Sequence, residues 1–249
     1  MAVAGLDIGS RTIGLVEMEG GKVISSRVVD TTFDPLEQCQ RLLSRRSYDI
    51  LVATGYGRHL AQANFADRVI TEIKAFAIGC NHIFPQCRTI LDIGGQDTKA
   101  ISVGPGGRVI DFQMNDRCAA GTGKFLEVMA AAMGMSLEEM GRLALEAEGE
   151  VKISSMCTVF AESEVTGLIA RGAPRSLIAR GLHEAICDRA SALLKRVGMQ
   201  RELVFAGGVA NNPCLRALLE ERLGLPLLVP ENPQVVGALG AALSAFADN

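Results

Sequence analysis

The chain has almost no aromatic surface and no strong excess of charge. Its 249 residues include no tryptophan and two tyrosines, and the formal net charge is −3 at pH 7. A surface that stacks nucleic-acid bases needs aromatic side chains, and electrostatic binding of nucleic acid needs basic runs, which are also lacking. We therefore expect no nucleic-acid partner.

Long apolar runs are absent too. No stretch approaches the roughly 20 apolar residues that a membrane helix needs, and no basic segment precedes the first apolar stretch. We therefore expect a cytoplasmic protein with no membrane partner. Hydrophobic residues make up 48% of the chain, which is enough for one large domain or two small domains with proper cores.

Several common nucleotide and metal motifs are missing. Gly121-Thr122-Gly123-Lys124 resembles the end of a Walker A motif, but Phe125 follows it and Cys118 stands where the first glycine belongs. No GxGxxG fingerprint follows a predicted strand, so a Rossmann domain is not expected. The three histidines are scattered, which argues against a zinc site.

The most informative stretch runs from Arg88 to Lys99 and has the sequence RTILDIGGQDTK. An apolar run delivers Asp92, and Gly94-Gly95 then predicts a tight turn into a second apolar run. Glycines in such a turn let backbone N–H groups approach an anion, because no Cβ stands in the way. A neighbouring carboxylate can hold Mg²⁺ together with phosphate. The pattern predicts a hairpin that binds nucleotide phosphates.

A near copy of this hairpin lies at the N-terminus, in the segment VAGLDIGSRTIGLVEM. Asp7-Ile8-Gly9 is the same tripeptide as Asp92-Ile93-Gly94, and each follows an apolar strand. The two tripeptides lie too far apart in the sequence for a solenoid repeat, whose periods are about 20–50 residues. The repeated pattern predicts two similar domains that face each other, each of which offers a carboxylate and a glycine turn to one ligand. Two unrelated hairpins are the simpler alternative, because turns of this composition are common.

Strands and helices alternate along the rest of the chain, which predicts an α/β sheet. Thr71 can cap a helix that begins at Glu72, whereas residues 58–67 predict an irregular crossing between lobes. Gly207-Gly208 follows the apolar strand 203–206 and precedes a helix. A nucleotide base or phosphate is commonly bound at such a junction, where the helix N-terminus adds partial positive charge.

The seven cysteines are an odd number in a chain without a secretory signal, which favours free thiols or metal ligation over disulfides. Cys118 and Cys157 each precede a predicted helix, whose dipole stabilises a thiolate. Two thiolates are too few for an iron–sulfur cluster, which usually takes four, although two chains related by symmetry would supply four. Their spacing alone favours two buried apolar thiols.

Together, the two Asp-Ile-Gly hairpins, the Glu72 helix, the Gly207-Gly208 turn and the Gly/Ala-rich last helix resemble the actin-like ATPase superfamily. Within it, the chain is similar to the BadF/BadG/BcrA/BcrD-type ATPases. That family includes the activators (component A) of 2-hydroxyacyl-CoA dehydratases and the ATPase subunits of benzoyl-CoA reductase. The resemblance covers the whole chain and is strongest over residues 92–99, 114–123 and 156–164.

This resemblance implies an α/β actin-like fold with two ribonuclease-H-like lobes and nucleotide in the cleft. Lobe I would comprise residues 1–67 and 236–249, and lobe II residues 68–235 with the second hairpin, the adenosine turn and the cluster cysteines. It also implies ATP or ADP with Mg²⁺, with Asp7 and Asp92 near the metal and Glu72 positioning the attacking water. The nucleotide contacts it implies are Gly9, Ser10, Arg11, Thr12, Gly94, Gly95, Gln96, Gly207, Gly208, Asn211 and Gln234.

The resemblance further implies an anaerobic homodimer with one 4Fe–4S cluster between subunits, held by Cys118 and Cys157 of each chain. ATP hydrolysis would be coupled to transfer of one low-potential electron to a partner. The partner would be a 2-hydroxyacyl-CoA dehydratase or a related CoA-ester or double-cubane-cluster reductase, and ferredoxin or flavodoxin would supply the electron. Two other functions stay open: a small-molecule kinase of the same superfamily, or a non-redox actin-like interaction protein.

Overall fold

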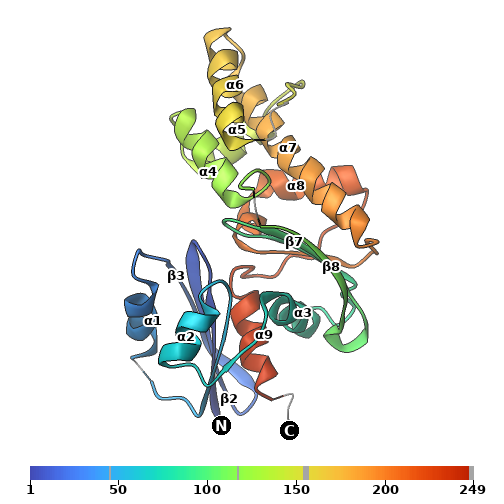
Figure 1. Ribbon diagram of the computed structural model, residues 1–249. Coiled ribbons are helices and arrows are strands. Elements are labelled where there is room, and N and C mark those ends of the chain that lie inside the picture. Colours follow the sequence, from blue (N-terminus) through green and yellow to red (C-terminus); the bar gives the residue numbers. More distant parts are fainter. Residues whose placement is uncertain (45, 117, 154–156, 247–249) are drawn as a thin grey trace.

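The computed structural model describes residues 1–44, 46–116, 118–153 and 157–246, which form two β-sheets on either side of a pair of helices (Figure 1). The first sheet has the order β3-β2-β1-β4-β5. Its central strand β1 pairs antiparallel with β2 and parallel with β4. The strands are β1 (Ala2–Ile8), β2 (Thr12–Glu19), β3 (Lys22–Asp30), β4 (Ile50–Thr54) and β5 (Arg68–Val69).

The second sheet repeats this arrangement in the order β8-β7-β6-β9. Strand β6 pairs antiparallel with β7 and parallel with β9, and Leu228 forms a parallel bridge to Val204 at the place that β5 takes in the first sheet. The two sheets are therefore equivalent in topology, as the repeated tripeptide predicts. The strands are β6 (Thr89–Ile93), β7 (Thr98–Val103), β8 (Val109–Asn115) and β9 (Leu203–Ala206).

The equivalence of the two sheets extends to one glycine in each. Gly55 follows β4 with a φ of +85°, and Gly207 follows β9 with a φ of +83°. A Cβ at Gly55 would lie 2.4 Å from Asp7 Oδ1, and a Cβ at Gly207 would lie 2.3 Å from Asp92 Oδ1. Both positions need glycine, because of the positive φ and because each aspartate packs directly on the glycine backbone.

Helices α3 (Glu72–Ile83) and α9 (Val236–Ser244) lie side by side between the two sheets (Figure 1). Helix α9 is almost entirely buried, which confirms the tight packing expected from its glycines and alanines. The backbones approach so closely that a Cβ on Gly240 would lie 1.8 Å from the carbonyl oxygen of Ala75 in α3. Since α3 and α9 pack on each other, the assignment of one helix to each lobe stays a prediction.

This contact makes Gly240 a sensitive position. We expect Gly240→Ala to destabilise the protein by about 3 kcal/mol, because the added methyl group forces α3 and α9 apart. The measurement is the free energy of unfolding in urea. The matched control is Gly167→Ala in a different helix, where a Cβ meets only the far end of Arg171 at 3.9 Å. That change should stabilise the helix by about 0.5–1 kcal/mol. Equal stability of the two variants would contradict the tight α3–α9 packing.

Of the remaining helices, α1 and α2 pack on the first sheet and α7 packs on the second, whereas α4, α5, α6 and α8 pack on α7. Helices α1 and α2 bury Cys39, Leu42 and Ala61 against the first sheet. The prediction that residues 58–67 are irregular is wrong, because packing of Ala61 on the sheet stabilises a short, otherwise polar helix there. These helices are α1 (Pro35–Leu43), α2 (Arg58–Asn64), α4 (Gly123–Ala132), α5 (Leu137–Leu145), α6 (Thr158–Ala170), α7 (Arg175–Arg196) and α8 (Pro213–Leu223). In the described ranges, every helix is too short or too polar to cross a membrane.

Candidate functional site

A cavity of about 700 Å³ opens where the β1–β2 hairpin of one sheet faces the β6–β7 hairpin of the other. All the residues that the sequence suggested for nucleotide and its metal line this single cavity, although they come from distant parts of the chain. They are Asp7, Gly9, Ser10, Arg11, Thr12, Glu72, Asp92, Gly94, Gly95, Gln96, Gly207, Gly208, Asn211 and Gln234.

The two hairpin tips have the same turn. The Gly9 amide donates a hydrogen bond to the Thr12 carbonyl at 3.0 Å, and the Gly94 amide donates to the Asp97 carbonyl at 2.9 Å. Because glycine leaves the rest of the turn uncovered, other amides at each tip can approach a phosphate. The geometry therefore offers one anion-binding turn from each sheet.

Arg11 connects the first tip to the second sheet's half of the molecule. Its side chain packs on Gly95, where a Cβ would lie 2.3 Å from Arg11 Cγ. Its guanidinium pairs with Glu127 of α4 at 2.7 Å. Arg11 is thus a cation at the mouth between the two tips, within reach of an anion bound there.

Two buried aspartates face the cavity from equivalent strands. Burial raises the pKa of Asp7 well above its ordinary value, and the charges of Glu72 and Asp92 raise it further. Burial also raises the pKa of Asp92 to about 6, in spite of the nearby Lys99. In each aspartate, Oδ1 is buried without a hydrogen-bond partner. Unpartnered carboxylate oxygens and mutual repulsion both fit a hard cation such as Mg²⁺.

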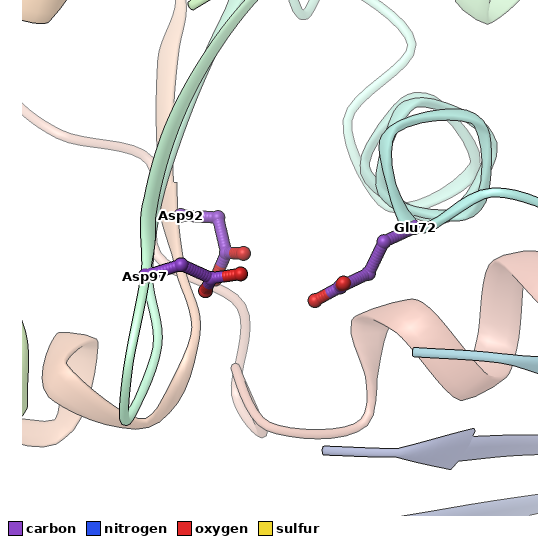
Figure 2. A group of neighbouring side chains, drawn as sticks. All are labelled: Glu72, Asp92 and Asp97. Atoms are coloured by element: carbon purple, nitrogen blue, oxygen red, sulfur yellow. The ribbon is translucent and has the colours of Figure 1, made fainter. Parts of the chain in front are cut away.

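A third acidic side chain reaches the site from α3. Thr71 is the N-cap of this helix, and its hydroxyl accepts a hydrogen bond from the Lys74 amide, so that Glu72 is the first helical residue. Figure 2 shows Glu72 pointing from α3 toward Asp92 and Asp97 on the opposite side. The helix cap therefore fixes Glu72 at the edge of the cavity, as the sequence predicts.

Lys99 belongs to this group and was missed by sequence reasoning. Its ammonium group lies 2.9 Å from Glu72 Oε1 and 3.1 Å from Asp92 Oδ2. The signal that could have found it is the hairpin register, in which Asp92 on β6 stands directly opposite Lys99 on β7. Residues directly opposite each other on neighbouring strands have side chains on the same face.

The far end of the cavity combines the Gly207-Gly208 turn with parts of α5 and α8. The Asn211 amide nitrogen donates a hydrogen bond to Gln234 Oε1 at 3.2 Å, which fixes these two polar side chains at the wall. The Ser136 hydroxyl accepts a hydrogen bond from the Glu139 amide at the start of α5, and one face of this helix lines the cavity, which no sequence pattern indicates. That face contributes Leu137, Glu138, Gly141, Arg142 and Leu145.

The cysteines fall into two groups. Cys118 and Cys157 are exposed, whereas Cys39, Cys80, Cys87, Cys187 and Cys214 are buried. The expectation from spacing, that Cys118 and Cys157 are buried apolar thiols, is wrong. Burial raises the pKa of the other thiols, to about 12 for Cys39 and Cys187, so that they stay protonated and unreactive.

The two exposed cysteines precede helices at different distances, since Cys118 lies five residues before α4 begins. Cys157 is the N-cap of α6, and Cys118 lies in the loop between β8 and α4. Arg117 and Met156, which flank them in the sequence motifs, lie outside the described residues. The dipole at the start of α6 stabilises a thiolate at Cys157.

The loop that carries Cys118 is hydrogen-bonded to the second hairpin. The Gly123 and Lys124 amides, in the first turn of α4, donate to the carbonyls of Gly94 and Gly95 at 2.9 and 2.8 Å. The Thr98 hydroxyl donates to the Gly121 carbonyl at 2.7 Å. These bonds connect the phosphate-type turn directly to the cysteine loop, which is a much shorter path than the chain through β7 and β8.

One chain offers half of the thiolates that an iron–sulfur cluster needs. Among the residues described, no group of three metal-ligating side chains includes Cys118 or Cys157. A 4Fe–4S cluster takes four cysteine ligands. Two exposed cysteines fit such a cluster when a second copy of the chain supplies the other two.

The fold and the cavity define a class: this is an α/β ATPase with the actin-like fold and one nucleotide cleft between two equivalent sheets, as the sequence predicts. The chain belongs to the BadF/BadG/BcrA/BcrD ATPase family, whose model matches residues 4–245.

Characterised relatives resemble this chain over nearly its whole length. It is 41% identical to the 2-hydroxyisocaproyl-CoA dehydratase activator of Clostridioides difficile, covering 99% of this chain and 95% of that protein. It is 38% identical to the (R)-2-hydroxyglutaryl-CoA dehydratase activating ATPase of Acidaminococcus fermentans, covering 97% and 96%. The solved structure of the Clostridium difficile activator with bound ADPNP has a TM-score of 0.90 at 41% identity, covering 100% of this chain and 95% of that one.

Proposed function

We propose that this protein is an ATP-dependent activator that passes one low-potential electron to a partner enzyme. The observation that carries the proposal is the direct hydrogen bonding between the Gly94-Gly95 turn of the nucleotide cavity and the loop of Cys118. A turn of the proposed nucleotide site is thus hydrogen-bonded directly to the segment that carries an exposed thiol, which we propose as a metal ligand. The names of the relatives, as activators of 2-hydroxyacyl-CoA dehydratases, support the same conclusion.

In the cavity, ATP would lie with its phosphates between the two hairpin tips and its adenosine at the far end. Ser10, Arg11, Thr12 and the amides of Gly95 and Gln96 would bind the phosphates, and Gly9 and Gly94 would form the turns that place them. Gly207, Gly208, Asn211 and Gln234 would contact adenosine. Bound ADPNP in the similar Clostridium difficile structure supports nucleotide in this cleft.

The acidic groups of the cavity have distinct proposed roles. Asp7 and Asp92 would hold Mg²⁺, which when bound neutralises charge that develops on the phosphates. Glu72, at the first turn of α3, would orient the attacking water. These carboxylates come from two equivalent hairpins and from α3, and all three line the same cavity.

The redox part of the proposal needs a homodimer. Cys118 and Cys157 from each subunit would hold one 4Fe–4S cluster, which supplies the transferable electron when it is bound. Val159 and Phe160 follow Cys157 and are 67% and 68% exposed, which is unusual for apolar residues at a helix start. This apolar surface beside the cysteine supports contact with a second subunit.

The partner would be a 2-hydroxyacyl-CoA dehydratase, or a related CoA-ester or double-cubane-cluster reductase. Ferredoxin or flavodoxin would return the electron to the activator after each transfer. A benzoyl-CoA reductase subunit of Thauera aromatica, which is 32% identical over 81% of this chain, supports the reductase option. The cytoplasm is the compartment where we expect such a reduced, anaerobic protein to work.

The coupling between cavity and cysteine loop can be tested by iron removal. We expect Mg-ATP to change the rate at which a ferrous chelator strips iron from the anaerobic protein by about tenfold, because nucleotide closes the cleft and moves the loop. We expect Thr98→Val to reduce this nucleotide effect, because it removes the buried hydrogen bond to Gly121, worth about 1 kcal/mol.

The matched control is Thr89→Val, which removes another buried threonine hydroxyl, bonded to the Gln200 backbone away from the cavity. It should leave the nucleotide effect as in the wild type. A chelation rate that nucleotide does not change would contradict the proposed coupling. A colourless protein that phosphorylates a metabolite would indicate a kinase, and nucleotide-dependent sedimentation without iron would indicate a filament-forming protein.

A further inference from the structure

The acidic group at the cavity has the composition of a metal site. Glu72, Asp92 and Asp97 each offer a carboxylate oxygen, and these oxygens lie within 4.8 Å of one another. Figure 2 shows Asp92 and Asp97 reaching from the second hairpin toward Glu72 on α3. Three carboxylates this close repel one another strongly unless a cation lies between them.

The protein supplies that cation itself. The Lys99 ammonium lies 2.7 Å from Asp97 Oδ1, 2.9 Å from Glu72 Oε1 and 3.1 Å from Asp92 Oδ2. An ammonium group has three N–H donors, so each carboxylate receives one of them. The Lys99 side chain is 1% exposed and Asp92 is 2% exposed, so water is kept from the bond between them, whereas the Glu72 and Asp97 side chains are 24% and 26% exposed.

Lys99 stands behind the carboxylates as seen from the cavity. Glu72, Asp92 and Asp97 line the cavity, and Lys99 does not. The lysine is therefore a cation that is paired with the three carboxylates from behind and that does not itself line the nucleotide cavity.

The bonds to Lys99 occupy one oxygen of each carboxylate and leave the other free. Asp92 Oδ2 is bonded to the lysine, and Asp92 Oδ1 has no partner. Glu72 is bonded through Oε1, which orients the side chain that we propose positions the attacking water. One lysine thus fixes the orientation of side chains from α3 and from the β6–β7 hairpin at the same time.

We propose that Lys99 is a positioning residue that occupies the Glu72–Asp92–Asp97 group in place of a metal ion. Divalent metal then enters the cleft with nucleotide and not before it. The lysine also holds Asp92 and Glu72 in the orientation that hydrolysis needs. This second part rests on the proposed function, whereas the first part concerns metal binding alone.

The test of the first part is Mn²⁺ binding without nucleotide. Binding is measured as the loss of the electron paramagnetic resonance signal of free Mn²⁺. We expect Lys99→Met, which keeps the length of the side chain and removes its charge, to bind Mn²⁺ about tenfold more tightly than the wild type, because three carboxylates are then left for the metal. Lys22→Met, at an exposed lysine of β3, is the matched control and should bind as the wild type does.

The test of the second part is steady-state ATP hydrolysis by the same variants. We expect Lys99→Met to lower kcat about a hundredfold while KM for ATP changes less than about threefold, because the lysine orients catalytic groups and does not contact the nucleotide. A residue that only fills the core would lower the folded fraction and leave the kcat of the folded molecules unchanged.

The two readouts separate the failure of this inference from the failure of the proposed function. Mn²⁺ binding by Lys99→Met equal to that of the wild type would overturn the first part, even if ATP hydrolysis is normal. Wild-type kcat in the folded variant would overturn the second part. If Lys99→Met does not fold, the double variant Lys99→Met/Asp97→Asn removes one charge of each sign, and its kcat and KM then test the orienting role in the same way.

Discussion

Anaerobically purified Cys118→Ser protein is expected to be colourless, whereas the wild type is expected to be brown with about four irons per dimer. The same loss is expected for Cys157→Ser. Each cysteine is exposed, so that neither substitution disturbs the core. In a dimer each substitution removes two of the four thiolates at once, and a serine hydroxyl is a poor replacement for a thiolate.

The matched control for this experiment is Cys39→Ala, which removes a completely buried thiol beneath the first sheet. Its iron content should equal that of the wild type, although its stability falls slightly because a small cavity remains. Iron content is measured by a colorimetric assay, with absorbance near the charge-transfer bands as a second readout. Full iron content in Cys118→Ser would show that the metal is held elsewhere, and the proposed cluster site would then be wrong.

Substitution of Asp7 by asparagine is expected to lower the rate of ATP hydrolysis and to raise the stability of the metal-free protein. Asp7→Asn should lower the rate of Mg-dependent phosphate release from ATP by about a hundredfold or more, because the loss of a preorganised charge at the metal removes stabilisation of the transition state. In the metal-free protein the same change should raise the midpoint of thermal unfolding. Burial and the charges of Glu72 and Asp92 disfavour the ionised carboxylate, and a neutral amide avoids that cost.

Asp30→Asn is the matched control for Asp7→Asn. Asp30 also lines the cavity, but it is exposed at the end of β3. We expect its substitution to change hydrolysis less than about threefold, because a solvated carboxylate contributes little to charge stabilisation. Near wild-type hydrolysis by Asp7→Asn would show that Asp7 is not a metal ligand, and the assignment of the first hairpin would have to be changed.

The hairpins could be predicted from the sequence because they are local structures. An apolar strand, an aspartate and a glycine turn occupy a dozen residues, and the same pattern occurs twice. The helix that begins at Glu72 was predictable for the same reason, since Thr71 and the residues it caps are close in sequence. Recognition of the family followed from motifs of this short-range kind.

Prediction from the sequence was less successful where tertiary packing decided the local structure or the exposure of a residue. Residues 58–67 form the helix α2 through contact of Ala61 with the first sheet, which local composition does not report. The apolar run at 227–229 pairs with β9 only through a bridge at Leu228. Spacing alone favoured burial of Cys118 and Cys157, and their exposure became clear only from the structure.

The sequence by itself therefore determined the class of the protein, the two hairpins and a set of residues that line one cavity. Only the tertiary structure showed that α5 lines the cavity, that α4 is hydrogen-bonded to the Gly94-Gly95 turn, and that Lys99 lies among three carboxylates. The physical reason is that these contacts join residues on different elements. Their distances depend on how helices and sheets pack, and not on the short-range patterns that a sequence displays.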